Sequence, residues 1–330
     1  MLAFLQTNRD RQWVKQIEEK ITIRAVPMLN PDGAELYQRR NLQSIDINRD
    51  ALALQTPEAQ LLKKLRDDWN PAIGFNLHNQ GSLTTVGRTN KQATISLLVV
   101  YGDAAKTPSE GLRRNERVAG AMVLALKKFI PDNIARYDDS FTPTAFGDNF
   151  TAWGTPVILI ETGALYGKDE MFLVKLNFFA FLTALHVLAD GSEKDQDPQP
   201  YLTLGENAAG PLYNVIFRGA KIISLTENKS FRADIAVNTE RRRASFSAPN
   251  FIREIGDMGG SYGLEEYSAV DFNVVSRFGS LKIGELAELL FYRKDRQIDW
   301  TSKELEKQFP PDAVFSTGKW IKGEGIVPKK

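Results

Sequence analysis

Short apolar runs alternate with helical stretches through the first 190 residues, and this alternation constrains the fold more than any other feature. The runs at residues 71–77, 95–100 and 156–160 have the length and composition of buried strands. Helices are predicted over residues 56–68, 110–130 and 171–189. Strands that alternate with helices indicate an α/β fold, here a mixed, mostly parallel sheet flanked by helices.

Two polar residues stand where apolar strands end. His78 follows the run at 71–77, and Glu161 follows the run at 156–160. Ligands bind at the carboxyl ends of strands in open α/β sheets. Because both residues share this position, we expect them to contribute to one site.

A third polar segment precedes both of these residues. A strand is expected at 21–29, followed by an Asn-Pro-Asp-Gly turn at 30–33 and a loop that carries Arg39, Arg40, Asn48 and Arg49. A guanidinium group offers two parallel N–H donors that match the two oxygens of a carboxylate. This loop is therefore a candidate carboxylate-binding segment.

The length and the change in texture predict two domains. Residues 191–200 are polar and rich in Pro and Gly, which indicates a linker after a domain at 1–190. Residues 201–330 contain short strand-like runs and form a small β-rich accessory domain by this interpretation. The predicted strands are 212–217, 221–225, 233–237, 244–247 and 289–292, and the arginine run 241–243 is expected to be a solvated turn.

Charge and composition exclude several classes of protein. The formal net charge of +1 gives no general field for nucleic acid, and the absence of cysteine excludes disulfides and thiolate metal sites. The run at 171–189 carries Lys175, Asn177 and His186, so it is predicted to be a buried helix and not a membrane span. The first residues are too short an apolar run for a signal peptide.

Each candidate residue also has a simpler interpretation. His78 can be a hydrogen-bonded structural residue instead of a metal ligand, and His186 fits a satisfied core position. Glu161 can be a general base with a raised pKa, or it can be neutralised by one of the loop arginines. The residue types alone leave these alternatives open.

Taken together, the segments resemble the zinc metallocarboxypeptidases, the carboxypeptidase A-like peptidases. The similar segments occur in the order of the family over about residues 1–190. They are Val-Pro-Met-Leu-Asn-Pro-Asp-Gly (26–33), Arg-Arg-Asn (39–41), Asp-Ile-Asn-Arg-Asp (46–50), Pro-Glu (57–58), Phe-Asn-Leu-His (75–78) and Ile-Leu-Ile-Glu-Thr-Gly (158–163).

This resemblance implies a function and a role for each residue. The function is hydrolysis of a C-terminal peptide or amide bond, by a zinc-bound water that Glu161 activates, in a substrate with a free C-terminal carboxylate. The implied roles are zinc ligand for His78, carboxylate binding for Asn48 and Arg49, and carbonyl polarisation for Arg39. Arg40 is the alternative to Arg39 if the local alignment shifts by one, and Tyr137 is the expected mobile tyrosine.

The chain departs from the family in its metal ligands. The family supplies two zinc ligands from a His-x-x-Glu motif upstream of the Asn-Pro-Asp-Gly segment, and no such motif occurs here. We expect an N-terminally truncated enzyme; the alternative is a non-catalytic relative that binds peptide C-termini. Family members are often exported, but this sequence shows no export signal.

Overall fold

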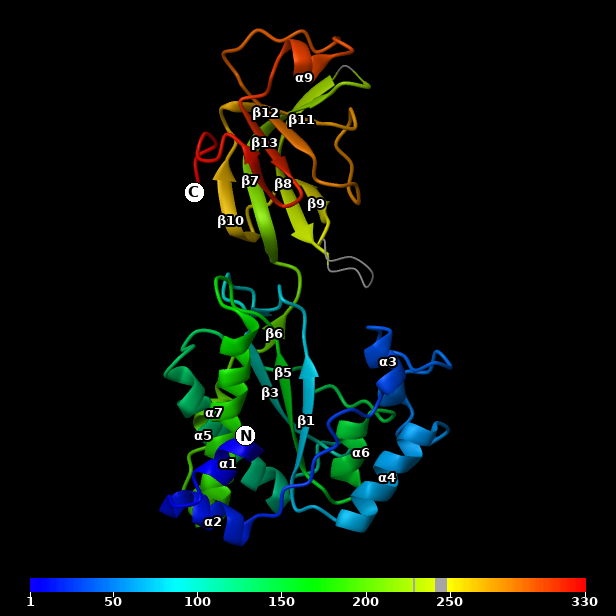
Figure 1. Ribbon diagram of the computed structural model, residues 1–330, viewed down its shortest axis with the longest axis vertical. Helices are drawn as coiled ribbons and strands as arrows, with labels where there is room; N and C mark the ends of the chain where they lie inside the picture. Colours follow the sequence, from blue (N-terminus) through cyan, green and yellow to red (C-terminus); the bar gives the residue numbers. More distant parts are fainter. Residues whose placement is uncertain (228, 241–247) are drawn as a thin grey trace. The chain divides into compact units, whose positions relative to one another are not determined.

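A computed structural model describes residues 1–227, 229–240 and 248–330. The chain forms two compact units, Met1–Ala208 and Ala209–Lys330, which are described separately below (Figure 1). The expected strand at 244–247 and the arginine run 241–243 lie outside the described residues.

A four-stranded sheet forms the centre of the first unit, in the order β1-β5-β3-β4. The strands are β1 (Gly74–Asn79), β5 (Val157–Thr162), β3 (Ile95–Val100) and β4 (Ile134–Arg136). β5 runs parallel to β1 and antiparallel to β3, and β3 runs parallel to β4. Two of these three pairings are parallel, so the mixed, mostly parallel sheet is confirmed.

Helices cover both faces of this sheet, as the alternating pattern predicts. In Figure 1, α5 (Glu110–Lys127) and α7 (Glu170–Asp190) lie on one face, and α4 (Pro57–Trp69) and α6 (Phe146–Ala152) lie on the other. The remaining short elements of this unit are α1 (Leu2–Thr7), α2 (Gln12–Lys20), α3 (Pro31–Glu35), η1 (Ile47–Arg49), η2 (Ser192–Lys194), α8 (Gln199–Leu202) and two short strands, β2 (Thr85–Val86) and β6 (Asn207–Ala208), which pair antiparallel.

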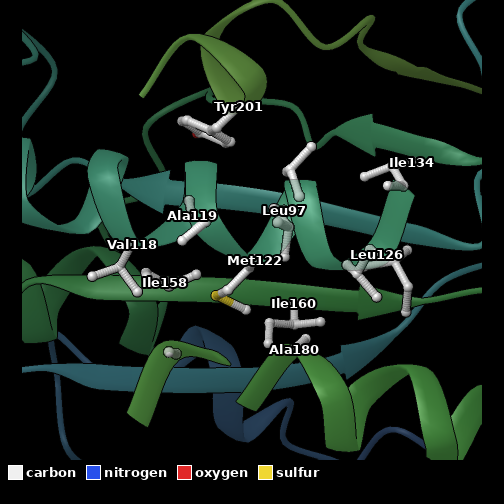
Figure 2. Packing of buried hydrophobic residues seen from close by; sticks show 14 of the residues in the cluster. Leu97, Val118, Ala119, Met122, Leu126, Ile134, Ile158, Ile160, Ala180 and Tyr201 are labelled. Carbon is white, nitrogen blue, oxygen red and sulfur yellow. The ribbon is translucent and has the colours of Figure 1, made fainter. Parts of the chain in front are cut away.

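The main core of the first unit lies between the sheet and helices α5 and α7. Figure 2 shows Met122 of α5 packed with Ile158 and Ile160 of β5 and with Leu97 of β3. Side chains alternate between the two faces of a strand. Therefore the intervening residues of β5 and β3 face the opposite side of the sheet, toward α6.

Local capping signals explain where two of the helices begin. The Thr56 side chain accepts a hydrogen bond from the Ala59 backbone N–H, and Pro57 occupies the first position of α4. In the same way, the Asn30 side chain accepts from the Gly33 N–H. The segment predicted to be an Asn-Pro-Asp-Gly turn is thus the capped first turn of α3.

The predicted strand at 21–29 is absent. These residues have no regular secondary structure, and within the described chain β1 pairs with β5 alone. Their apolar side chains pack elsewhere: Ile21 and Ile23 contact the cluster formed by α1, α2 and α7, and Leu29 contacts the cluster around α4. The apolar pattern of this segment therefore reflects two separate packing contacts and not a strand ladder.

Helix α7, which was predicted to be a buried helix, is buried on one face only. Leu176, Ala180 and Ala184 are buried, whereas Met171 and Val174 are more than half exposed. By length and composition alone, α7 is the one helix in the described part of the chain that passes the test for a membrane span, a test that core helices also pass. Its packing against α5 and α2 places it in the first unit.

The segment expected to be a linker, 191–200, belongs to the first unit. Tyr201 of α8 is buried in the main core, and its hydroxyl accepts a hydrogen bond from the Val99 N–H. The boundary between the units consequently falls after Ala208 and not at 190–200. A polar composition with two prolines indicated a linker, but the Arg117 side chain of α5 donates a hydrogen bond to the Glu193 carbonyl oxygen, and the adjacent Tyr201 is anchored in the core.

The second unit is β-rich, as predicted. Its strands are ordered β14-β13-β12-β11-β7-β8-β9, and β10 pairs in parallel with β7. The elements are β7 (Leu212–Ser224), β8 (Lys229–Thr239), β9 (Asn250–Gly256), β10 (Tyr262–Ser268), β11 (Phe272–Ser276), β12 (Leu289–Arg293), β13 (Ala313–Ser316), β14 (Lys319–Lys322) and the short helix α9 (Leu305–Gln308).

Candidate active site

A polar cavity of about 280 Å³ lies on the α6 side of the sheet in the first unit. Strands β1, β3 and β5 form one wall, and η1 with the loop between β4 and α6 forms the rest. The predicted site residues that line it are Arg39, Asn48, Arg49, His78, Tyr137 and Glu161. Residues from five separate parts of the chain therefore converge on one space.

Strand alternation explains why His78 and Glu161 face this cavity. Ile158 and Ile160 point into the core, so Leu159 and Glu161 of the same strand point to the other face. His78 of β1 is the register partner of Glu161 in the parallel β1–β5 pair. The two strand ends therefore lie beside each other at this cavity.

Glu161 is a buried carboxylate with one unpaired oxygen atom. Its side chain is 7% exposed, and its Oε2 atom has no hydrogen-bond partner among the described residues. Burial raises the pKa of Glu161 to about 7, and the positive charge of Arg39 opposes this rise. No described residue forms an ion pair with Glu161, so this carboxylate can exchange a proton near neutral pH.

His78 is held in its neutral form by the same surroundings. Burial is the main cause that lowers its pKa, and Arg39 and Arg49 lower it further, while Asp46 acts in the opposite direction. A neutral imidazole keeps one ring nitrogen with a free lone pair. His78 can therefore accept a hydrogen bond or ligate a metal at physiological pH.

Helix η1 presents hydrogen-bond donors to the cavity. The Asn48 Oδ1 atom accepts a hydrogen bond from the Phe146 N–H at 2.9 Å, so the Nδ2 group of Asn48 remains the free end of the amide. The Arg49 Nη1 group donates to the Asn48 carbonyl oxygen at 2.7 Å. Both side chains are thereby oriented, and each keeps N–H donors without a described protein partner.

The two neighbouring arginines occupy different environments. Arg39 lines the cavity, and its Nε atom donates to Asp46 Oδ2 at 2.7 Å. Arg40 does not line the cavity; its Nη1 group donates to the Ser44 carbonyl oxygen at 2.9 Å. The structure thus places Arg39, and not its neighbour, beside His78 and Glu161.

Tyr137 lines the cavity where the chain leaves β4. It is partly buried, and its pKa is raised by burial first and then by the negative charges of Glu161 and Asp138. Its backbone N–H donates to the Leu97 carbonyl oxygen, which fixes the start of the loop to β3. The phenol is therefore protonated and can donate a hydrogen bond into the cavity.

Asp46 and Asp148 are two of the four aspartates in the cavity to which no role was assigned from the sequence. Asp46 bonds to Arg39, and Asp148 of α6 accepts a hydrogen bond from the Thr142 N–H at 2.9 Å. Burial raises the pKa of Asp148. The signal for Asp46 was its place within the segment 46–50, but only its contact with Arg39 shows what it does.

The described residues do not provide a zinc site. They contain no group of three or more His, Cys, Asp or Glu side chains with metal-binding geometry. His78 is the histidine in the cavity, whereas His186 lies on α7, within 3.6 Å of Asp190 and in contact with the ring of Trp13. A catalytic zinc site needs about three protein ligands, so the donor set present here does not fit this ion.

Comparisons with known proteins give a partial and distant match. No protein-family model matches the chain. Over 90 residues it is 32% identical to probable carboxypeptidase 2 of Trichophyton verrucosum, covering 27% of this chain and 17% of that protein. Carboxypeptidase 2 of Trichophyton rubrum is 32% identical over 69 residues, covering 21% and 13%. The chain thus spans less than a fifth of the length of these curated relatives.

A structural comparison finds the crystal structure of murine aminoacylase 3. The overlap covers 87% of this chain and 84% of that chain, with 12% sequence identity and a TM-score of 0.30. A score at this level does not identify a shared fold. The site and the sequence matches thus define an α/β unit that is similar over part of its length to carboxypeptidases and that has a cavity lined by a buried carboxylate and cationic side chains.

Proposed function

We propose that the first unit binds the C-terminal carboxylate of a peptide or peptide-like molecule and hydrolyses the adjacent amide bond, as a metallocarboxypeptidase does. The observation that carries this proposal is the convergence of Asn48, Arg49, Arg39 and Glu161 on one cavity. Donors and base stand on different walls of this cavity, which suits a substrate that extends from one to the other.

Each of these residues has a distinct part in the proposed reaction. The donors of Asn48 and Arg49 hold the substrate carboxylate, because their partly fixed amide and guanidinium groups match its two oxygens. The free Nη groups of Arg39 stabilise the oxyanion that forms on the scissile carbonyl. Glu161 removes a proton from the attacking water and returns it to the leaving amine.

Zinc is the cofactor that the family resemblance implies, and the described residues of this chain do not supply its site. His78 is the histidine that lines the cavity, and the described residues contain no group of three potential metal ligands. The proposed roles therefore belong to side chains of this chain alone, and none of them involves a metal ion.

Calorimetric titration with an N-acetylated dipeptide tests the binding step. We expect the free acid to bind at least tenfold more tightly than its C-terminal amide, because the amide lacks the charge that Arg49 recognises. Arg49→Met should remove this preference, whereas Arg40→Met is a matched control that should retain it, since Arg40 lies outside the cavity. Equal affinity for acid and amide would refute carboxylate recognition.

Mass spectrometry of the released amino acid tests the hydrolytic step, with and without added zinc. We expect turnover in the wild-type protein and a loss of about 10²-fold or more in Glu161→Gln, because a general base contributes on this scale. Preserved carboxylate binding with no turnover under either condition would reject the hydrolase.

The second candidate function is binding of peptide C-termini without catalysis. The observation that favours it is the single histidine in the cavity and the lack of a three-ligand metal group among the described residues. The two experiments above separate the candidates, since both predict carboxylate binding and only the first predicts turnover.

A further inference from the structure

We infer that Asp46 is a positioning residue that holds Arg39 and the Asn48–Arg49 turn in one fixed arrangement. This inference rests on the proposed function, because it concerns how the donors of that site are oriented. Neither the sequence pattern nor the distant relatives assign this role to Asp46.

Asp46 uses three acceptor atoms to fix three partners. Its Oδ2 atom accepts from Arg39 Nε at 2.7 Å, and its Oδ1 atom accepts from the Asn48 N–H at 3.0 Å. Its backbone carbonyl oxygen accepts from the Arg49 N–H at 2.9 Å. One residue thereby connects the proposed oxyanion donor with the proposed carboxylate-binding pair.

The geometry of the contact leaves the useful donors of Arg39 free. Asp46 engages only the Nε atom, and no hydrogen bond from the Nη groups to another described residue is seen. The Arg39 side chain is 57% exposed, whereas that of Asp46 is 14% exposed. A long, mobile side chain is thus fixed at its base by a carboxylate that is largely shielded from water.

Asp46 also sets the charge balance around His78. Two guanidinium groups, Arg39 and Arg49, act on this ring from the cavity side, and Asp46 is the acidic group that opposes them. Its loss would leave the positive charges of Arg39 and Arg49 beside the neutral imidazole without the acid that opposes them there. The repulsion between the two guanidinium groups would then be less well compensated.

A role in positioning differs in its consequences from that of an ordinary surface ion pair. Exposed ion pairs contribute little to stability, and their removal is not expected to change a remote ligand. A displacement of a catalytic donor by about 1 Å can reduce a rate by about 10²-fold. The decisive test is therefore whether a substitution of Asp46 changes kcat and KM for the substrate by more than the loss of an exposed ion pair would.

Asp46→Asn provides this comparison. The substitution keeps the size and the acceptor for Asn48, but it removes the charge and replaces the acceptor that Arg39 uses. We expect a reduction of at least tenfold in kcat for the dipeptide, a smaller change in KM, and partial rescue in Asp46→Glu. Asp68→Asn, which breaks an exposed pair with Lys64 in the same unit, should leave both kinetic constants unchanged.

A second measurement decides the inference even if the protein does not turn the dipeptide over. The Arg39 Nε–H proton can be observed by NMR in protein labelled with ¹⁵N-arginine, assigned through Arg39→Lys. We expect slow exchange of this proton in the wild-type protein and fast exchange in Asp46→Asn. Unchanged exchange, or kinetics of Asp46→Asn within twofold of an active wild type, would overturn the role of Asp46. If the wild-type protein does not bind the carboxylate but the Nε–H proton is protected from exchange, the proposed function is rejected. The contact between Arg39 and Asp46 would still be established.

Discussion

Each unit contains ionic groups that are largely shielded from water, and the hydrogen bonds of the two sets are completed to very different degrees. In the second unit, Arg218 donates to Asp234 and Glu266 and to the carbonyl oxygens of Met258 and Ser261. In the first unit, Glu161 has a buried oxygen atom without a described partner. The charged groups around Arg218 are therefore all paired, whereas the carboxylate of Glu161 is not.

This difference separates a structural network from a candidate site. The two acids around Arg218 also accept backbone N–H groups, Asp234 from Gly219 and Glu266 from Gly263. A fully connected network stabilises one arrangement of its strands. An unpaired buried carboxylate costs free energy, and perturbed groups of this kind cluster at functional sites.

The largest expected effect comes from removal of the central cation in the second unit. Arg218→Met leaves Asp234 and Glu266 close together without compensation, which should lower the free energy of unfolding by about 3–5 kcal/mol. Urea unfolding of the full chain measures this. Arg277→Met is a matched control with a more exposed arginine paired to Glu288 and Glu306, and it should cost only about 1 kcal/mol. Equal losses of free energy of unfolding in the two variants would mean that the shielded network of Arg218 is no more stabilising than the exposed pairs of Arg277.

Glu161→Gln should act in the opposite direction. The pKa of Glu161 is raised from 4.5 to about 7 on folding, so the folded protein binds more protons than the unfolded chain between these values. The contribution of this group to stability therefore falls as the pH rises through that window. At pH 8 we expect the variant to be more stable than the wild type by about 2 kcal/mol, and at pH 4 the two should be equal.

Thermal unfolding at both pH values checks this prediction. A loss of stability in Glu161→Gln at pH 8 would mean that the carboxylate is paired in solution, like the acids around Arg218. The two units would then no longer differ in whether their shielded acids are paired.

Asn48→Ala should have a smaller effect on stability than either of these changes. The substitution removes the acceptor for the Phe146 N–H at the start of α6, which should cost about 1 kcal/mol. It also removes a neutral donor from the proposed carboxylate site, so affinity for the dipeptide should fall by up to about tenfold. Calorimetry and urea unfolding of one preparation give both values. If the free energy of unfolding changes and the affinity for the dipeptide does not, Asn48 has a structural role and does not bind the carboxylate.

The smallest effect is expected outside both sets of residues. Lys64 and Asp68 form an exposed i,i+4 pair on α4. Lys64→Ala should change the free energy of unfolding by no more than about 0.5 kcal/mol. A larger change would show that exposed ion pairs also stabilise this protein. The losses in free energy of unfolding for Arg218→Met and Arg277→Met would then have to be compared with that value.

Elements with strong local signals were predicted well from the sequence. The expected strand 95–100 matches β3, and the Thr56 cap with Pro57 marks the start of α4. These signals depend on neighbouring residues, because capping and apolar run length act within one element. The predicted strand at 21–29 failed because a strand also needs a partner, and the side chains of this segment pack against helices instead.

The candidate site was predicted in part for the same reason. Arg39, Asn48, Arg49, His78, Tyr137 and Glu161 all line one cavity, whereas Arg40 does not. Sequence spacing cannot decide between adjacent arginines in a loop, because the direction of each side chain depends on its hydrogen bonds. Contact with Asp46 directs Arg39 inward, and contact with the Ser44 carbonyl oxygen holds Arg40 outside.

The sequence by itself determined the α/β pattern, the β-rich second unit and the placement of His78 and Glu161 at strand ends. These features follow from the periodicity and length of apolar runs, which are local properties. The tertiary structure decided the register that sets His78 opposite Glu161, the burial that raises the pKa of Glu161, and the link from Asp46 to Arg39. Each of these depends on groups brought together from distant parts of the chain, where desolvation and hydrogen bonding depend on the folded surroundings and not on residue type.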